Sequence, residues 1–298
     1  MPIKKQSGRY FVLLGTTVLQ MMELYDNTCF ECSKLITQKY STSFSLGIRA
    51  FDKAFRYPVY AVYGFVRYAD EIVDTFHHHD KLQLINNFRQ ETFRAITDKI
   101  SLNPVLHSFQ QVVNHYHIEH NQIEAFLSSM EMDIEKKAYS KDAYDTYIYG
   151  SAEVVGLMCL RIFADNNNEL YKALLPQARS LGAAFQKVNF LRDVRADLEE
   201  RGRTYFPGID FNNFTEEDKF GIQQDIERDF KDAFEGIKRL PNGTRLGVYI
   251  AYTYYRQLFK KISYTPANVI LQKRIRISDT RKMGLYIKAV LQQKLNVI

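Results

Sequence analysis

The feature that most restricts the fold of this 298-residue chain is the spacing of its apolar residues. From Cys29 onward they recur with helical periodicity, whereas alternating runs bounded by Gly or Asn-Gly, which mark β-hairpins, are nearly absent. The sequence therefore predicts an all-α fold, cut by a few turn signals into about eight to ten helices. The signals are Tyr57-Pro58, His77 to Asp80, Asn103-Pro104, residues 166–168, Pro207-Gly208, Pro241-Asn242-Gly243 and Thr265-Pro266.

Residues 23–298 contain no Gly/Ser-rich linker and no abrupt change in composition, so we expect one helical domain. Residues 1–22 form an N-terminal extension of uncertain status. Its apolar stretch, Phe11 to Leu19, is too short to span a bilayer and follows three basic residues, which is the outline of a signal peptide. No small-x-small cleavage pattern follows. The alternative is an extension ahead of a true start at Met21 or Met22.

Composition excludes several classes of protein. Three cysteines cannot pair fully and lack partners at zinc spacing, so neither a disulfide scaffold nor a structural zinc site is expected, and a cytoplasmic location fits. The net charge of +6 suits anionic partners. Nucleic acid is not expected among them, because several arginines lie next to carboxylates instead of gathering on one exposed face.

The first informative segment runs from Tyr63 to Asp74. Asp70 and Asp74 are four residues apart, so on a helix they project from one face about 6 Å apart along the axis. Arg67 lies one turn before Asp70 on the same face, and Tyr63 one turn before that. A charged face inside an otherwise apolar helix is costly and requires a reason.

The second segment repeats this arrangement between Gln186 and Asp197. Asn189, Asp193 and Asp197 are spaced i, i+4 and i+8, and Arg192 lies within a turn of them. Oxygen ligands of this kind suit Mg²⁺, with Mn²⁺ as a substitute, and the arginines at 67, 192 and 203 are candidates to bind phosphate oxygens. One such face is usually solvated; two in apolar helices favour a site.

Other candidates have simpler interpretations. His77 to His79 and the pair Cys29 and Cys32 are expected to be ordinary loop and helix residues. Glu131 and Asp133 interrupt an amphipathic helix, and we expect a surface or supporting role for both in preference to a catalytic one.

Together with Tyr40-Ser-Thr-Ser-Phe44 upstream and Arg203-Thr-Tyr205-Phe-Pro207 downstream, these segments resemble the squalene/phytoene synthase family from about residue 28 to about residue 290. The resemblance implies a single-domain isoprenoid synthase helical bundle with a central cavity. It implies that Mg²⁺ is held by Asp70, Asp74, Asn189, Asp193 and Asp197. Substrate contacts, with Tyr63 and Arg67 also catalytic, are implied for Tyr40, Ser41, Thr42, Ser43, Phe44, Tyr63, Arg67, Tyr149, Gln186, Arg192, Arg203, Tyr205 and Tyr255.

The resemblance also implies the reaction. Members join two prenyl diphosphates head to head through a cyclopropyl diphosphate, inside walls that exclude water from an allylic cation. Phe44, Tyr63 and Tyr149 are candidates to stabilise that cation, and Gly150 and Gly156 match a central helix whose small residues let a prenyl chain pass close to the backbone. One departure is Tyr40, where a histidine is common.

The sequences of these motifs are most similar to those of bacterial phytoene synthases. We therefore expect the protein to condense two geranylgeranyl diphosphates to phytoene in carotenoid biosynthesis. The modest volume of Ile48, one turn beyond Phe44, leaves room for a twenty-carbon chain. The alternatives are a dehydrosqualene or squalene synthase using farnesyl diphosphate, and a catalytically inactive scaffold relative. NADPH and a C-terminal anchor are not expected. We expect peripheral contact with the inner face of the membrane, first in the basic C-terminal third; the oligomeric state cannot be read.

Overall fold

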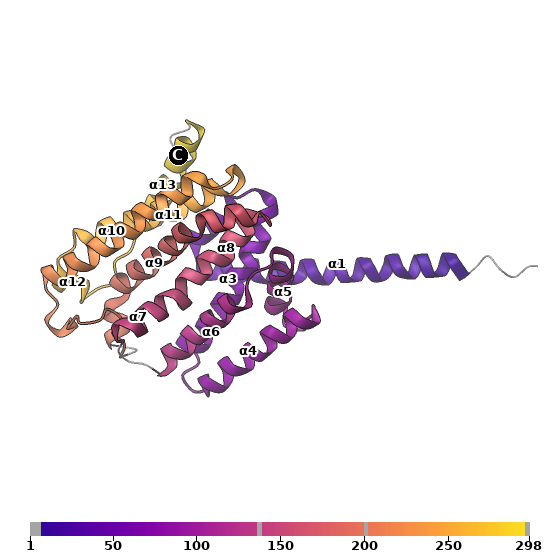
Figure 1. Ribbon diagram of the computed structural model, residues 1–298, viewed down its shortest axis with the longest axis horizontal. Helices are drawn as coiled ribbons and strands as arrows, with labels where there is room; N and C mark the ends of the chain where they lie inside the picture. Colours follow the sequence, from indigo (N-terminus) through magenta and orange to yellow (C-terminus); the bar gives the residue numbers. More distant parts are fainter. Residues whose placement is uncertain (1–6, 136–138, 200–201, 296–298) are drawn as a thin grey trace, which may run out of the picture.

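The chain folds into a bundle of helices (Figure 1). The structure is a computed structural model that describes residues 7–135, 139–199 and 202–295, with side chains from residue 20 onward. These residues form no β-strand. The helices are α1 (Ser7–Tyr40), α2 (Thr42–Arg49), α3 (Lys53–Asp74), α4 (Lys81–Asp98), α5 (Pro104–Tyr116), α6 (His120–Glu135), α7 (Lys141–Ile148), α8 (Val154–Ala164), α9 (Asn168–Glu199), α10 (Glu216–Arg239), α11 (Asn242–Ser263), α12 (Ala267–Ile270) and α13 (Asp279–Lys294), with a π-helical turn η1 (Tyr149–Glu153) and a 3₁₀ turn η2 (Phe211–Asn213).

The all-α prediction is confirmed, and most predicted breaks fall at helix ends or between helices. Asp80 and Asn103 each accept backbone N–H groups from the first turn of the following helix, which leaves fewer end donors without partners. The prediction was wrong at Pro58, which lies inside α3, where the helix already begins at Lys53. Pro58 is the sixth residue of α3, so it costs one hydrogen bond to the carbonyl of residue 54, and the burial of Val59 and Tyr60 next to it offsets that loss.

Two apolar cores divide the bundle. The first is built mainly on α3, α5, α6 and α8, where the rings of Phe65 and Phe109 stack 4.0 Å apart. The second joins α9, α10 and α11, and there Phe190 and Tyr205 stack at the same centroid distance of 4.0 Å. Lys187, buried between α9 and α10, is ion-paired with Asp229 at 2.7 Å and fixes the rotation of α9.

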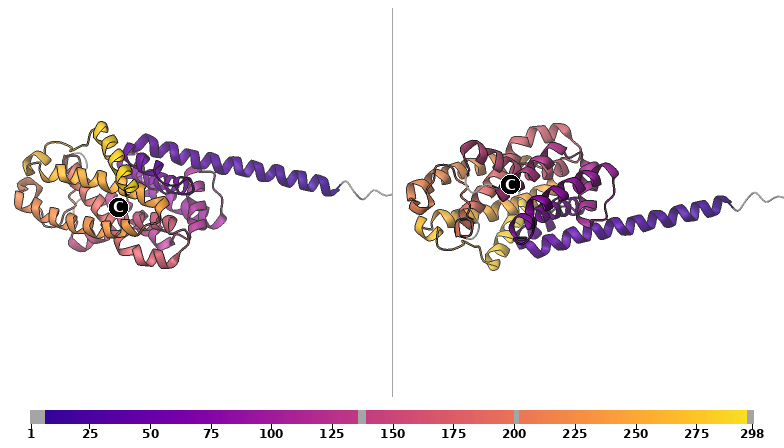
Figure 2. Two further views of the ribbon diagram at one scale, coloured as in Figure 1. Left: turned by 90° about the horizontal axis from the view of Figure 1, so that it is seen from above. Right: turned by 90° about the horizontal axis from the view of Figure 1, so that it is seen from below.

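Helix α1 begins outside the bundle and projects away from it, as both views in Figure 2 show. The C-terminal part of α1 packs against α3 and α5. The helix runs without a break from Ser7 through residue 22, so the secondary structure marks no boundary there. Residues 1–6 of the predicted extension lie outside the described residues, and its status stays a prediction.

The stretch Lys141–Ala164, which combines α7, η1 and α8, has the length and apolarity of a membrane-crossing helix. However, 56% of its most apolar window is buried inside the bundle. A helix buried in a protein core can have the same length and apolarity. Its small residues have a packing role, because an added Cβ at Gly156 would lie 2.7 Å from the Ala178 carbonyl oxygen and one at Gly182 would lie 2.5 Å from the Ala152 carbonyl oxygen. Helices α8 and α9 therefore cross at backbone contact.

Candidate active site

A cavity of about 590 Å³ lies between the two cores and is lined by α2, α3, α8, α9 and α11. Its polarity changes in one direction on every wall. On α3 the lining runs from Val59 to Asp74, and on α9 from Leu174 to Asp197, with the apolar residues first in both. On α2, which runs the other way, Ser41 precedes Ile48. One end of the cavity is therefore polar, and the rest is an apolar passage. From Leu174 to Asp193 the cavity follows roughly 28 Å of helix α9.

The first wall of the polar end is the α3 face, formed by Arg67, Asp70 and Asp74. Arg67 Nη1 lies 3.8 Å from Asp70 Oδ2, and its Nη2 is ion-paired with Glu71. Asp74 Oδ1 lies 3.5 Å from Nη1 of Arg203. Burial raises the pKa of Asp70 to about 7, against the opposing pull of Arg67, and the charge of Asp74 adds to the rise.

The second wall is the α9 face, formed by Asn189, Asp193 and Asp197. Asp193 Oδ2 accepts from Arg192 Nη2 at 2.5 Å, and Asp193 Oδ1 lies 2.7 Å from Nε of Arg274. Asn189 Oδ1 accepts from the Tyr255 hydroxyl at 3.2 Å. Asp197 is buried, and its carbonyl oxygen accepts from the backbone N–H of Arg203 at 2.7 Å. Three chain segments thus converge on this wall.

Asp133 lies near the α3 face at the centre of a buried cluster, 3.7 Å from the Arg203 Nη1 that also faces Asp74. Its carboxylate accepts from the hydroxyls of Tyr147 at 2.6 Å, Tyr139 at 2.9 Å and Tyr205 at 3.2 Å. Burial raises the pKa of Asp133 although Arg203 and the hydroxyls oppose the rise. For Arg203, burial alone would lower the pKa, but Asp133, Tyr205 and Asp74 outweigh it and raise the pKa. The cluster therefore holds the guanidinium charged beside the α3 face.

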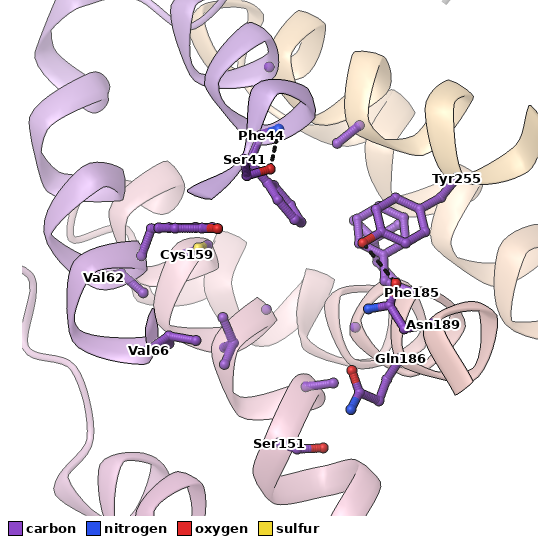
Figure 3. Close-up of a pocket in the computed structure, with 18 of the residues that line it drawn as sticks. Ser41, Phe44, Val62, Val66, Ser151, Cys159, Phe185, Gln186, Asn189 and Tyr255 are labelled. Atoms are coloured by element: carbon purple, nitrogen blue, oxygen red, sulfur yellow. Dashed lines mark hydrogen bonds between the residues drawn. The ribbon is translucent and has the colours of Figure 1, made fainter. Parts of the chain in front are cut away.

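Aromatic rings line the transition from the polar end to the apolar passage. The Phe44 ring lies between Tyr63 and Tyr255, with centroid distances of 5.8 and 6.2 Å. Phe185 stacks on Tyr255 at 3.9 Å, and Figure 3 shows this pair beside Asn189, with Gln186 pointing into the same space. The Tyr40 ring lies 4.3 Å from the Arg67 guanidinium carbon. A cation formed here would face π-electron density on several sides.

Most of the predicted site residues line this one cavity. They are Tyr40, Ser41, Ser43, Phe44, Tyr63, Arg67, Asp70, Asp74, Gln186, Asn189, Arg192, Asp193, Asp197, Arg203, Tyr205 and Tyr255. Thr42 does not line it, because its hydroxyl turns outward and accepts from Lys282 Nζ at 3.0 Å. Tyr149 also lies outside the lining, 5.3 Å from the guanidinium carbon of Arg179.

Two of the misplaced predictions share a cause, which is the choice of helix face. Tyr147 lines the cavity instead of Tyr149, and Ser151, Val155 and Cys159 follow it at intervals of four residues. Every face of a helix offers residues four apart, so this spacing alone does not select Tyr147 over Tyr149. Gly150 packs against α6, where an added Cβ would lie 2.4 Å from the Ala125 carbonyl oxygen, so it does not border the cavity.

Two further lining residues were missed or set aside. Glu131 fits the surface role expected of it and is ion-paired with Arg89 at 2.7 Å, but Asp133, two residues on, is buried in the site. A carboxylate between two methionines in an amphipathic helix was the available signal. Arg274 belongs to the basic C-terminal third, for which the sequence predicted membrane contact only. No local pattern connects it to Asp193, 81 positions earlier.

The sequence profile of the squalene/phytoene synthase family matches residues 37–281. The chain belongs to this family. Squalene/phytoene synthases are prenyltransferases, so the chain is a transferase of prenyl groups that acts on prenyl diphosphates.

Individual relatives agree with the family. The chain is 27% identical over 271 residues to phytoene synthase of Arthrospira platensis, across 82% of this chain and 87% of that one. It is also 27% identical over 197 residues to 4,4'-diapophytoene synthase of Staphylococcus haemolyticus, across 65% and 66%. These relatives support a role in isoprenoid and carotenoid biosynthesis.

Solved structures show the same fold. A dehydrosqualene synthase crystallised with a ligand superposes with a TM-score of 0.75 at 21% identity, covering 90% of this chain and 98% of that one. Squalene synthase HpnC from Alicyclobacillus acidocaldarius gives a TM-score of 0.71 at 18% identity, covering 82% and 97%. The squalene/phytoene synthase fold is therefore shared along almost the whole chain.

Proposed function

We propose that this family member is a phytoene synthase, which condenses two geranylgeranyl diphosphates through prephytoene diphosphate to phytoene. One observation carries the proposal: two faces of oxygen ligands, with arginines beside them, line the polar end of a cavity whose other walls are apolar. An anionic diphosphate fits the first region and a polyprenyl chain the second.

We propose Mg²⁺ as the cofactor, with Mn²⁺ as a substitute. Among the described residues, no three His, Cys, Asp or Glu side chains lie close enough together to hold a metal ion unaided. The donor set nevertheless fits Mg²⁺, which keeps waters and takes substrate phosphate oxygens in addition to one or two carboxylates. Asp70 and Asp74 would hold it on one wall, and Asn189, Asp193 and Asp197 on the other. When bound, it would neutralise the diphosphate and favour its departure.

The chain's own residues then supply charge, orientation and exclusion of water. Arg67, Arg192, Arg203 and Arg274 would donate to diphosphate oxygens as the C–O bond of the first substrate breaks. The 2,3 double bond of the second substrate would attack the allylic cation, and proton loss would close the cyclopropane. Phe44, Tyr63 and Tyr255 would face the cation. Loss of the second diphosphate, rearrangement and loss of a second proton give phytoene with no reductant, so NADPH is not expected.

The proposal is tested with purified protein, Mg²⁺ and each prenyl diphosphate separately. We expect phytoene from geranylgeranyl diphosphate and loss of product with EDTA. Efficient turnover of farnesyl diphosphate, with geranylgeranyl diphosphate ignored, would make the protein a dehydrosqualene or squalene synthase. Metal-dependent binding of a thiodiphosphate analogue without turnover of either substrate would identify an inactive relative.

Chain length gives a finer test at Ile48, which is buried and lines the passage. Ile48→Phe adds a ring where the longer prenyl chain would run, so we expect the ratio of kcat/KM for geranylgeranyl over farnesyl diphosphate to fall about tenfold. Leu46→Phe, on the same helix but outside the lining, is the control. An unchanged ratio in Ile48→Phe would mean that this residue does not set the chain length of the substrate.

These substrates and products carry long apolar tails. We therefore also propose that the enzyme is cytoplasmic and makes peripheral contact with the membrane.

A further inference from the structure

Helix α13 presents an apolar stripe to solvent. Met283, Ile287 and Leu291, and Leu295 at the C-cap of the helix, follow one another at intervals of four residues, and each is between 49% and 73% exposed. Residues at this spacing share one face of a helix. The opposite face carries Ala289, which is fully buried, and α13 packs there on α11. A single exposed apolar residue needs no explanation, whereas four aligned on one face mark a contact surface.

The stripe is embedded in positive charge. Residues 273–295 contain seven Lys or Arg and a single Asp, a net charge of +6 that equals the charge of the whole chain. Arg281 and Lys288 are exposed along one edge of the stripe by helical geometry, and exposed Lys294 falls within it. Asp279 is ion-paired with Lys282 at the start of the helix, away from the stripe. The exposed face is therefore apolar in the middle and cationic around it.

This helix is anchored next to the polar end of the cavity. Lys282 donates to the Thr42 hydroxyl on α2 and lies 5.8 Å from the ring of Tyr254, which lines the cavity. The segment that leads into α13 carries Arg274, the partner of Asp193. At the other end, Tyr249 of α11 donates to Gln292 at 3.2 Å. Helix α13 is thus held against the outside of α2 and α11. Figure 2 shows it as the yellow helix beside the orange ones.

We propose that α13 docks on an anionic lipid surface, with the stripe among the acyl chains and the basic residues at the phosphate groups. An amphipathic helix with lysines and arginines around a narrow apolar face has this preference. A second copy of the chain fits less well, because a symmetric contact would place the same cations opposite one another. Nucleic acid offers no apolar counterpart to the four side chains. The docking does not depend on the reaction proposed above.

The test uses the absence of Trp from the chain. Ile287→Trp places one fluorophore on the stripe, and Phe220→Trp places one at an exposed position on α10 as the matched control. The full-length variants are mixed with vesicles of phosphatidylcholine, with and without phosphatidylglycerol. For Ile287→Trp we expect a blue shift of the indole emission, and quenching by brominated lipid, only with the anionic vesicles; Phe220→Trp should show neither effect. Equal responses in both variants, or none in Ile287→Trp, would overturn the proposal.

Vesicle flotation measures the contribution of each part of the surface. Ile287→Ser with Leu291→Ser, and separately Lys288→Glu with Lys294→Glu, should each lower binding to anionic vesicles by about tenfold or more. Phe220→Ser and Lys172→Glu, which change exposed residues elsewhere, should leave it unchanged. If light scattering instead shows a dimer that Ile287→Ser with Leu291→Ser dissociates, and vesicles are not bound, the stripe is a contact between copies and the lipid proposal fails.

Discussion

The α3 face and the α9 face carry the same Asp-x-x-x-Asp spacing, yet the bundle neutralises them differently. On α3, the described part of the chain places one arginine beside Asp70, which is Arg67 of its own helix; Arg67 also pairs with Glu71, and burial raises the pKa of Asp70 to about 7. On α9, Asp193 is held by its neighbour Arg192 and by Arg274 from a distant segment. Spacing fixes which residues share a face. The charge state of that face depends on what the rest of the chain brings to it.

The largest effect should come from removing one carboxylate from either face. We expect Asp70→Ala and Asp193→Ala each to lower kcat/KM for the prenyl diphosphate by about a thousandfold, because each wall is needed to neutralise the diphosphate. Asp145→Ala, an exposed carboxylate on α7, is the control. Steady-state kinetics across a Mg²⁺ titration would check this; near-normal activity in either variant would mean that its wall does not act on the diphosphate.

Arg274 gives Asp193 a second arginine, whereas the distant arginine on the α3 face, Arg203, lies beside Asp74 and not beside Asp70, so the removal of Arg274 tests the comparison directly. Arg274→Ala should lower kcat/KM by about a hundredfold, because a charge-assisted donor at the polar end is lost. Arg276→Ala, two residues away and exposed, should change it little. If the two variants behaved alike, Arg274 would belong to the basic surface only.

Asp133 supports the α3 face through Arg203, and we expect its loss to show first in stability. Asp133→Ala removes the acceptor of three buried tyrosine hydroxyls and the partner of this arginine, which should lower the free energy of unfolding by about 3 kcal/mol. Glu131→Ala, which removes a carboxylate that is ion-paired at the surface, should cost much less. Urea unfolding of both variants gives the comparison. Equal losses would contradict the supporting role of Asp133.

The smallest effect concerns the raised pKa of Asp70. A carboxyl whose pKa is near 7 in the folded protein, against an ordinary 3.8, contributes stability at low pH that is lost as the pH rises through 7. Asp70→Asn should therefore raise the Tm of the metal-free protein by about 2 °C at pH 8, after allowance for solvent screening. The gain should vanish near pH 4.

Asp193→Asn is the matched variant on the other face. It removes the carboxylate between two arginines, so no gain in Tm is expected at pH 8. Thermal melts at the two pH values decide the point. Stabilisation by both substitutions to the same extent would show that the two faces are electrostatically equivalent.

Much of the site was predictable because the two faces are local. The shared faces of Asp70 with Asp74, and of Asn189 with Asp193, follow from helical spacing alone, and both pairs line the cavity. The errors came where spacing leaves a choice. Tyr147 and Tyr149 lie on different sides of the continuous helical stretch formed by α7, η1 and α8. Only the packing of α7 and η1 against α6 shows which side faces the cavity.

Sequence by itself determined the all-α fold, the helix ends marked by capping residues, and the membership of each oxygen-ligand face, because hydrogen bonding and side-chain direction within a helix are set by residues a few positions apart. Only the tertiary structure decided that the faces meet at one end of an apolar cavity, that Arg274 reaches Asp193, and that Asp133 is buried among three tyrosines. These contacts join residues far apart in the chain. Their geometry depends on how whole helices pack, which no local pattern contains.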